Sequence, residues 1–207
     1  MSQIRVLVVE DEPLIAEDIR ETLDNIDFEV SGVAYDSDTA LQELSGNTPD
    51  IALLDVNLGS EMDGIDIAEI INKEYRIPFI FLTSYADRDT VDRAKLTRPM
   101  GYIVKPFDER DLFTTLEIAL HNFSLAQPKV DMTLDGLNRQ LLGKLTQKEF
   151  EILMSIFDGK TNRQMAEEHF ISLNTIKTHV KNLYDKLDVH TRTQALAKLR
   201  SMSGLLT

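Results

Sequence analysis

The first 122 residues alternate short, β-branched apolar runs with longer amphipathic stretches, and no other feature of the sequence constrains the fold as strongly. Runs such as Val6–Val9 and Phe79–Leu82 are almost wholly apolar, which is typical of parallel strands covered on both faces. Five such repeats predict a doubly wound parallel sheet with helices on both sides. The expected strands are Ile4–Val9, Phe28–Ala34, Ile51–Leu54, Phe79–Leu82 and Tyr102–Val104, and the expected helices are Pro13–Leu23, Asp38–Leu44, Gly64–Glu74, Asp87–Lys95 and Glu109–Phe123.

The alternation stops after residue 122. Residues 123–141 are rich in turn-forming and polar types, which predicts a linker with a short helical turn at Leu137–Leu142. From residue 142 to residue 207 helix signals dominate, including three pairs with capping-box spacing: Thr146 with Glu149, Thr161 with Gln164, and Thr191 with Gln194. This region is expected to form an all-α domain with helices at 146–158, 162–169, 173–187 and 192–202.

Charge is distributed unevenly between the two halves. Residues 1–122 carry 10 Lys and Arg against 26 Asp and Glu, a net −16, whereas residues 123–207 carry 12 against 9, a net +3. Such asymmetry suggests different partners for the two halves, with nucleic acid a candidate only for the basic one. The chain has no cysteine, which excludes disulfides, thiolate metal sites and cysteine catalysis. With no apolar run of membrane-spanning length and no signal-peptide pattern, we expect a cytoplasmic protein without a membrane partner.

Polar residues gather where the expected strands end. Glu10 and Asp11 follow the first strand, Asp55 ends the third, Thr83 follows the fourth and Lys105 follows the fifth. Parallel strands bring these ends to one edge of the sheet, so the carboxylates should attract a hard cation such as Mg²⁺. Taken singly, each residue is more often a turn, cap or surface residue than a functional one. Their joint occurrence at the ends of the correct strands favours a phosphoryl-transfer site with Asp55 as nucleophile.

Four segments closely resemble the signatures of response-regulator receiver domains. They are VVEDEP (8–13), LLDVNL (53–58), LTSYAD (82–87) and GYIVKPF (101–107). The resemblance covers about residues 3–122 and implies a flavodoxin-like (βα)5 fold. It implies that a sensor histidine kinase phosphorylates Asp55, and that Glu10, Asp11, Asp55 and the backbone carbonyl of Asn57 hold Mg²⁺.

The same resemblance assigns Thr83 and Lys105 to phosphate binding and Tyr102 to the switch, with a cis bond between Lys105 and Pro106. Movement of Thr83 and Tyr102 towards a phosphorylated Asp55 would repack the face formed by 87–95, the fifth strand and 109–123, and so promote a homodimer. One departure lies beside the site, where Leu58-Gly59-Ser60-Glu61 replaces the usual Met-Pro and adds about one residue.

The expected helix at 173–187 has an apolar stripe opposite a polar side that carries Lys177 and Lys181. Alone, such a lysine stripe is usually a solvated surface. However, three segments closely resemble the LuxR-type helix-turn-helix of NarL/FixJ response regulators. They are LTQKEFEIL (145–153), GKTNRQMAEEHFIS (159–172) and NTIKTHVKNLYDKLDVHTRTQAL (174–196). The resemblance implies that Lys177 and Lys181 read bases and phosphates in the major groove of DNA. It also implies that backbone contacts come from Asn174, Thr175, Thr178 and His179.

The resemblance further implies that the helix at 192–202 mediates dimerisation, and RNA polymerase is a further candidate partner. Two alternative functions compete with this interpretation. A phosphohydrolase with an Asp nucleophile would need a second Asp two residues on, where this chain has Asn57. A regulator controlled by protein partners, without phosphorylation, would have no need of the complete acidic set. A metal site at His169, His179 and His190 is rejected, because their spacing fits no common site. The chain is therefore predicted to be a DNA-binding regulator and not an enzyme.

Overall fold

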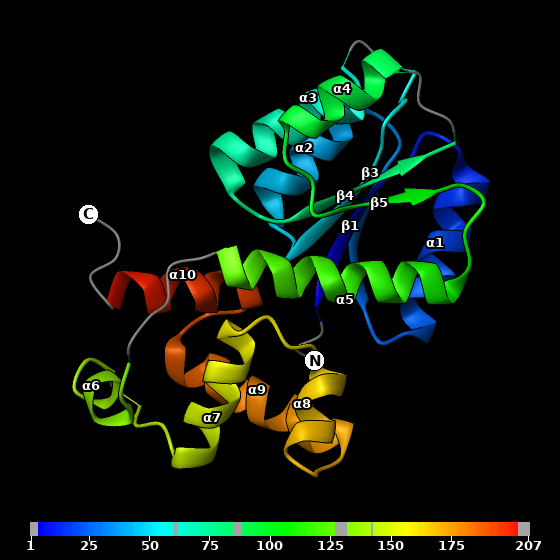
Figure 1. Ribbon diagram of the computed structural model, residues 1–207. Coiled ribbons are helices and arrows are strands. Elements are labelled where there is room, and N and C mark those ends of the chain that lie inside the picture. The colour runs from blue at the N-terminus through cyan, green and yellow to red at the C-terminus, as the bar shows by residue number, and fades with distance from the viewer. Residues whose placement is uncertain (1–3, 60–61, 85–87, 127–131, 142, 203–207) are drawn as a thin grey trace. The chain divides into compact units, whose positions relative to one another are not determined.

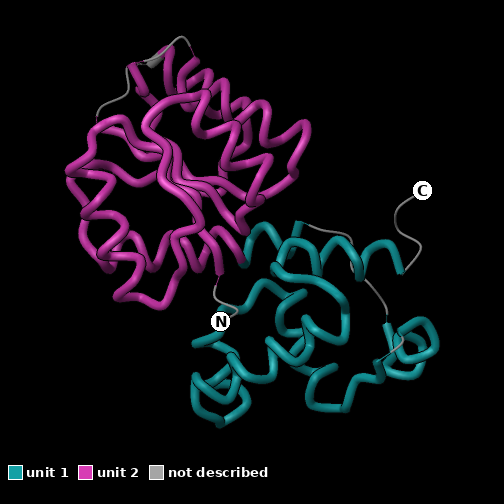
Figure 2. Tube along the Cα trace, turned by 180° about the vertical axis from the view of Figure 1, so that it is seen from behind, with its two compact units in different colours: residues 1–3, 121–207 teal, residues 4–120 magenta. Residues whose placement is uncertain are grey.

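The computed structural model describes residues 4–59, 62–84, 88–126, 132–141 and 143–202. The chain divides into two compact units, one of residues 4–120 and one of the residues from 121 onward (Figure 2). Predicted features at Ser60, Glu61, Asp87 and Leu142 lie outside the described residues.

The first unit contains a five-stranded parallel sheet in the order β2-β1-β3-β4-β5, which confirms the predicted doubly wound, flavodoxin-like architecture. The strand order reverses between β1 and β3, so their carboxyl ends flank the crevice where such sheets bind ligands. The strands are β1 (Arg5–Val9), β2 (Glu29–Ala34), β3 (Ile51–Asp55), β4 (Phe79–Thr83) and β5 (Gly101–Val104).

Helices cover both faces of this sheet (Figure 1). On one face, α1 (Pro13–Asn25) and α5 (Glu109–Ala126) bury Ile19, Leu23, Leu112 and Leu116 against β-strand side chains. The other face is covered by α2 (Ser37–Gly46), α3 (Gly64–Ile70), a π-helical turn, η1 (Ile71–Tyr75), and α4 (Arg88–Leu96). Strands β3 and β4 contribute to both cores and are buried along their whole length, as their apolar sequences predicted.

The second unit is helical and has its own hydrophobic core. Its helices are α6 (Leu134–Asn138), α7 (Gln147–Phe157), α8 (Asn162–Glu168), α9 (Leu173–Leu187) and α10 (Arg192–Met202). Full capping boxes form at Thr146 and Thr161, as predicted. At the third pair the Thr191 hydroxyl accepts the Gln194 N–H, but the Gln194 side chain accepts from His190 rather than from Thr191.

Two parts of the segment expected to be a linker are helical. Helix α5 continues to Ala126, beyond its predicted end at Phe123. The short helix expected at Leu137–Leu142 lies earlier, because Thr133 caps α6 through the N–H of Gly136. Leu137 of α6 is buried in the core of the second unit, so this stretch belongs to that unit's packing.

Candidate functional site

The predicted acidic site forms at the carboxyl edge of the sheet. Glu10 follows β1 and is fully buried, Asp55 is the last residue of β3, and Thr83 is the last residue of β4. Glu10, Asp11 and Asp55 each offer an oxygen atom, and these atoms lie within 4.8 Å of one another. Carboxylate oxygens at this density are the ligands that a small divalent cation prefers.

Lys105, just after β5 and joined to Pro106 by a cis bond as predicted, supplies the positive charge of this site. Its Nζ donates hydrogen bonds to the carboxylates of both Glu10 and Asp55, and the three side chains are nearly inaccessible to solvent. Burial raises the pKa of Glu10, with Lys105 opposing the shift. Burial also disfavours the charged form of Lys105, but its bonds to Asp55 and Glu10 outweigh that effect and raise its pKa.

Thr83 and Tyr102 border a cavity beside the acidic cluster. The cavity has a volume of about 470 Å³ and is lined mainly by apolar atoms, including those of Val56 and Ala94. Thr83 is 8% exposed, and within the described residues its hydroxyl has no hydrogen-bond partner. The Tyr102 side chain is 41% exposed, and partial burial raises the pKa of its hydroxyl. Leaving a buried hydroxyl unpaired is costly, so Thr83 is suited to gain a partner when the site is filled.

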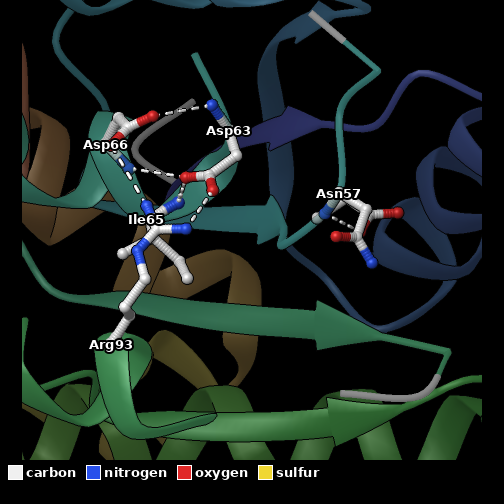
Figure 3. Close-up of polar contacts among 6 residues, drawn as sticks. Asn57, Asp63, Ile65, Asp66 and Arg93 are labelled. Atoms are coloured by element: carbon white, nitrogen blue, oxygen red, sulfur yellow. Dashed lines mark hydrogen bonds and ion pairs between the residues drawn. The ribbon is translucent and has the colours of Figure 1, made fainter. Parts of the chain in front are cut away.

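The loop after Asp55 lies close to the carboxylate. The backbone N–H of Asn57 donates to Asp55 Oδ1 at 2.8 Å, while the Asn57 side chain is exposed (Figure 3). Gly59 has a φ of +56°, the left-handed region that favours glycine. A Cβ on Gly64 would lie 1.9 Å from the backbone oxygen of Asp55, so only glycine fits there. Asp55 thus lies in the acidic cluster with the start of α3 packed directly against its backbone.

Sequence reasoning missed an ionic cluster at the end of this loop. Asp63 caps α3 and accepts from the N–H groups of Ile65 and Asp66, and Asp66 returns a bond to the Asp63 N–H (Figure 3). Arg93 of α4 donates to Asp63 Oδ2 at 2.8 Å and to Asp66 Oδ1 at 3.3 Å. The Asp-x-x-Asp spacing before an apolar helix was the available signal for the cap, but no local pattern identifies Arg93 as its partner.

In the second unit, α8 and α9 form the predicted helix-turn-helix. Ser172 caps α9 by accepting from the Thr175 N–H at 3.1 Å, and the turn between the helices contains Phe170 with a φ of +55°. The buried side of α9 carries Ile176, Val180, Leu183, Tyr184 and Leu187. The six predicted DNA contacts occupy other positions of α9 between residues 174 and 181. Four are exposed, and Lys177 and His179 are half-buried: Asn174, Thr175, Lys177, Thr178, His179 and Lys181.

A partly buried ion pair anchors α9 to α7. Lys186 Nζ donates to both carboxylate oxygens of Glu149, at 2.7 and 2.6 Å, and Glu149 also accepts from the N–H and hydroxyl of Thr146. Burial would raise the pKa of Glu149, but its bonds to Lys186 and Thr146 outweigh that effect and lower it. Arg192, at the start of α10, donates to the backbone oxygens of Ile156 and Lys160, at 2.5 and 2.9 Å. The Lys186 contact thus joins α9 to α7, and the Arg192 contacts join α10 to the end of α7.

Two family models account for most of the chain. Residues 6–117 match the response regulator receiver domain, and residues 143–199 match the bacterial regulatory proteins of the luxR family. The chain belongs to the two-component response regulators. The transcriptional regulatory protein LiaR of Bacillus subtilis (strain 168) is 32% identical to this response regulator over 204 residues, covering 93% of the chain and 94% of LiaR.

A second relative is the response regulator protein VraR of Staphylococcus saprophyticus, 31% identical over 198 residues, covering 93% of this chain and 94% of VraR. Among solved structures, the signal receiver domain of a modulated diguanylate cyclase from Desulfovibrio desulfuricans G20 is similar to this response regulator, with a TM-score of 0.57 and 35% identity. This similarity covers 59% of the present chain and 98% of the solved domain. The response regulator is thus a DNA-binding regulator of transcription with a kinase as phosphodonor, and neither family match favours the hydrolase alternative. No helix in the described ranges has both the length and the apolar character needed to cross a bilayer.

Proposed function

We propose that Asp55 accepts the phosphoryl group and that its phosphorylation controls DNA binding by α9. The observation that carries this proposal is the direct pairing of Asp55 with Lys105 inside a cluster that also holds Glu10 and Asp11. An isolated strand-end aspartate needs no buried lysine and no second and third carboxylate around it. A carboxylate that attacks a phosphorylated donor needs the lysine, and needs the other carboxylates to hold a cation, because the transferring group brings additional negative charge.

The acidic cluster fits Mg²⁺. Three carboxylates converge, and the single ammonium of Lys105 offsets only part of their charge. We assign the ligands to Glu10, Asp11, Asp55 and the backbone carbonyl of Asn57. The bound ion would supply charge neutralisation at the oxygens of the transferring phosphoryl group.

The chemical step is an in-line displacement. A carboxylate oxygen of Asp55 forms a bond to phosphorus while the bond from phosphorus to the histidine nitrogen of the kinase breaks, and the departing imidazole takes up a proton. Lys105 stays within reach of a phosphoryl oxygen, since it already contacts Asp55. The unpartnered hydroxyl of Thr83 donates to another phosphoryl oxygen.

The hydrogen bond from the Thr83 hydroxyl to the phosphoryl group is proposed to draw the end of β4 towards Asp55. This movement would let the Tyr102 ring enter the adjacent cavity. The 470 Å³ volume supports this role, because an aromatic ring can occupy it and bury apolar area. The repacked face, formed by α4, β5 and α5, would then favour a homodimer.

On the DNA side, Lys177 and Lys181 are proposed to contact bases and phosphates in the major groove. Asn174, Thr175, Thr178 and His179 are proposed to contact the backbone. A dimer formed through the receivers and α10 would present two such helices to paired half-sites. RNA polymerase is then a candidate partner at the promoter, and the cytoplasm is the expected compartment.

The test is incubation of the full chain with Mg²⁺ and acetyl phosphate, followed by intact mass measurement. We expect one added phosphoryl group in the wild type and none in Asp55→Asn. A matched control, Asp50→Asn, alters a buried aspartate just before β3 and should leave the addition intact. Phosphorylation that persists in Asp55→Asn would refute the assignment.

A further inference from the structure

Helix α4 has little apolar attachment to the receiver. Among its side chains that the structure describes, only Ala94 is buried, and the rest are partly or fully exposed. Beneath the helix, where a packed core would ordinarily lie, is the cavity bordered by Thr83 and Tyr102. Burial of apolar surface therefore contributes little to holding α4 in position.

Polar contacts hold α4 instead. Arg93 lies in the second half of α4, and its guanidinium donates to Asp63 Oδ2 at 2.8 Å and to Asp66 Oδ1 at 3.3 Å (Figure 3). At the carboxyl end of the helix, Asn72 of η1 donates to the backbone oxygen of Thr97 at 2.6 Å. The Asn72 contact holds the end of α4. Loss of the Arg93 contacts would therefore loosen the rest of the helix while its end stays attached.

Arg93 reaches the phosphoacceptor loop through this contact. Its partner Asp63 is the N-cap of α3 and the residue before Gly64, whose backbone lies against the carbonyl of Asp55. The Gly64 N–H also donates to the Val56 oxygen at 3.2 Å. A continuous chain of contacts thus joins the α4 guanidinium to the residues that flank the Asp55 carboxylate.

We propose that Arg93 is a positioning residue that fastens α4 to the loop after Asp55 and sets how readily the receiver leaves its unphosphorylated arrangement. The proposal rests on Asp55 as the phosphoacceptor. In the observed arrangement Tyr102 is partly exposed, the Thr83 hydroxyl is unpaired among the described residues, and the ion pair is made. The ion pair therefore stabilises that arrangement, and breaking it favours the competing one.

Hydrogen exchange of the α4 amides tests the ion pair without any phosphodonor. Arg93→Met removes the guanidinium, and Asp63→Asn removes its partner's charge while keeping a residue that caps helices equally well. Each is expected to speed exchange across residues 91–96 by about two- to fivefold, the range for a partly exposed ion pair. The double variant should exchange no faster than Arg93→Met alone, because that change already removes the contacts of the guanidinium with both Asp63 and Asp66.

Two controls separate this role from a general loss of structure. Lys95→Met removes a cation of the same helix whose partner, Asp92, also belongs to α4, and should leave exchange near the wild-type rate. Arg93→Lys keeps the charge and should restore exchange to within about twofold of the wild type. The claim that the ion pair holds α4 would be overturned by an unchanged exchange rate in Arg93→Met. It would also be overturned if the two single effects on the exchange rate multiplied in the double variant.

The phosphorylation time course with acetyl phosphate tests the coupling. Arg93→Met should be phosphorylated about two- to fivefold faster than the wild type, since the competing arrangement is more populated. Faster exchange with no change in phosphorylation rate would overturn the coupling. A wild-type chain that takes no phosphoryl group would instead refute the proposed function, while the exchange result would still decide the ion pair.

Discussion

Gly64 lies against the backbone carbonyl of Asp55 so closely that a methyl group would stand 1.9 Å from the oxygen. Gly64→Ala should therefore push the start of α3 away from the acidic cluster and cost about 1–3 kcal/mol of unfolding free energy, as overpacking does. Phosphorylation should slow as well. Urea denaturation and the acetyl phosphate assay measure the two effects. Gly46→Ala, where nothing lies within 4 Å of the added Cβ, should instead stabilise the chain by about 0.4–1 kcal/mol.

Replacing Thr83 by Val should stabilise the unphosphorylated chain while impairing its function. The Thr83 hydroxyl is buried and unpaired in the described residues, so its removal relieves a desolvation cost of about 1 kcal/mol. The same change removes the proposed donor to the phosphoryl group. Thr97→Val is the matched control, because that buried hydroxyl donates to the Ala94 oxygen at 2.8 Å and its loss should destabilise. Equal destabilisation by both changes in urea titrations would contradict the argument.

Lys177→Ala and Lys181→Ala should weaken DNA binding through lost phosphate contacts. Each variant is expected to make the slope of log affinity against log salt shallower by about 1, as loss of one phosphate contact predicts. Fluorescence anisotropy at several salt concentrations gives the slope. Lys73→Ala removes the same charge from η1 in the receiver, and a slope change of equal size there would point to a net-charge effect alone.

The Glu149–Lys186 pair should make the stability of the second unit depend on pH. Because the pKa of Glu149 is lowered in the folded chain, its contribution is complete above the ordinary value of 4.5 and is lost as the pH falls through the folded value. Glu149→Gln should cost about 1–3 kcal/mol at pH 7 and flatten this acid-side decline. Denaturation between pH 3 and pH 7 checks the prediction, with the more exposed Glu151→Gln on the same helix as control.

The acidic cluster was predictable because its members occupy strand ends, and a parallel sheet brings those ends together whatever the loops do. The helix-turn-helix was predictable because capping residues and an apolar period mark each helix locally. The ionic cluster of Asp63, Asp66 and Arg93 was not, because its members come from two helices whose approach depends on packing. The unpaired hydroxyl of Thr83 and the cavity beside it were also beyond sequence reasoning, since an absence of contacts has no sequence signature.

The extension of α5 to Ala126 and the shift of α6 to Leu134–Asn138 have a common cause. Both lie where turn-forming residues suggested a linker, but α5 stays helical to Ala126 and the cap at Thr133 starts α6 early. Thr133 is the instructive residue, because its role as N-cap fixes the start of α6 three residues before the predicted start.

The poor apolar attachment of α4 has a thermodynamic consequence. Among the described side chains of α4 only Ala94 is buried, so the helix can shift without uncovering much hydrocarbon and with little change in heat capacity. The enthalpy difference between its two positions should then be nearly constant with temperature, and the balance between them should shift with ionic strength. A receiver built in this way would respond to its kinase differently in dilute and in concentrated electrolyte.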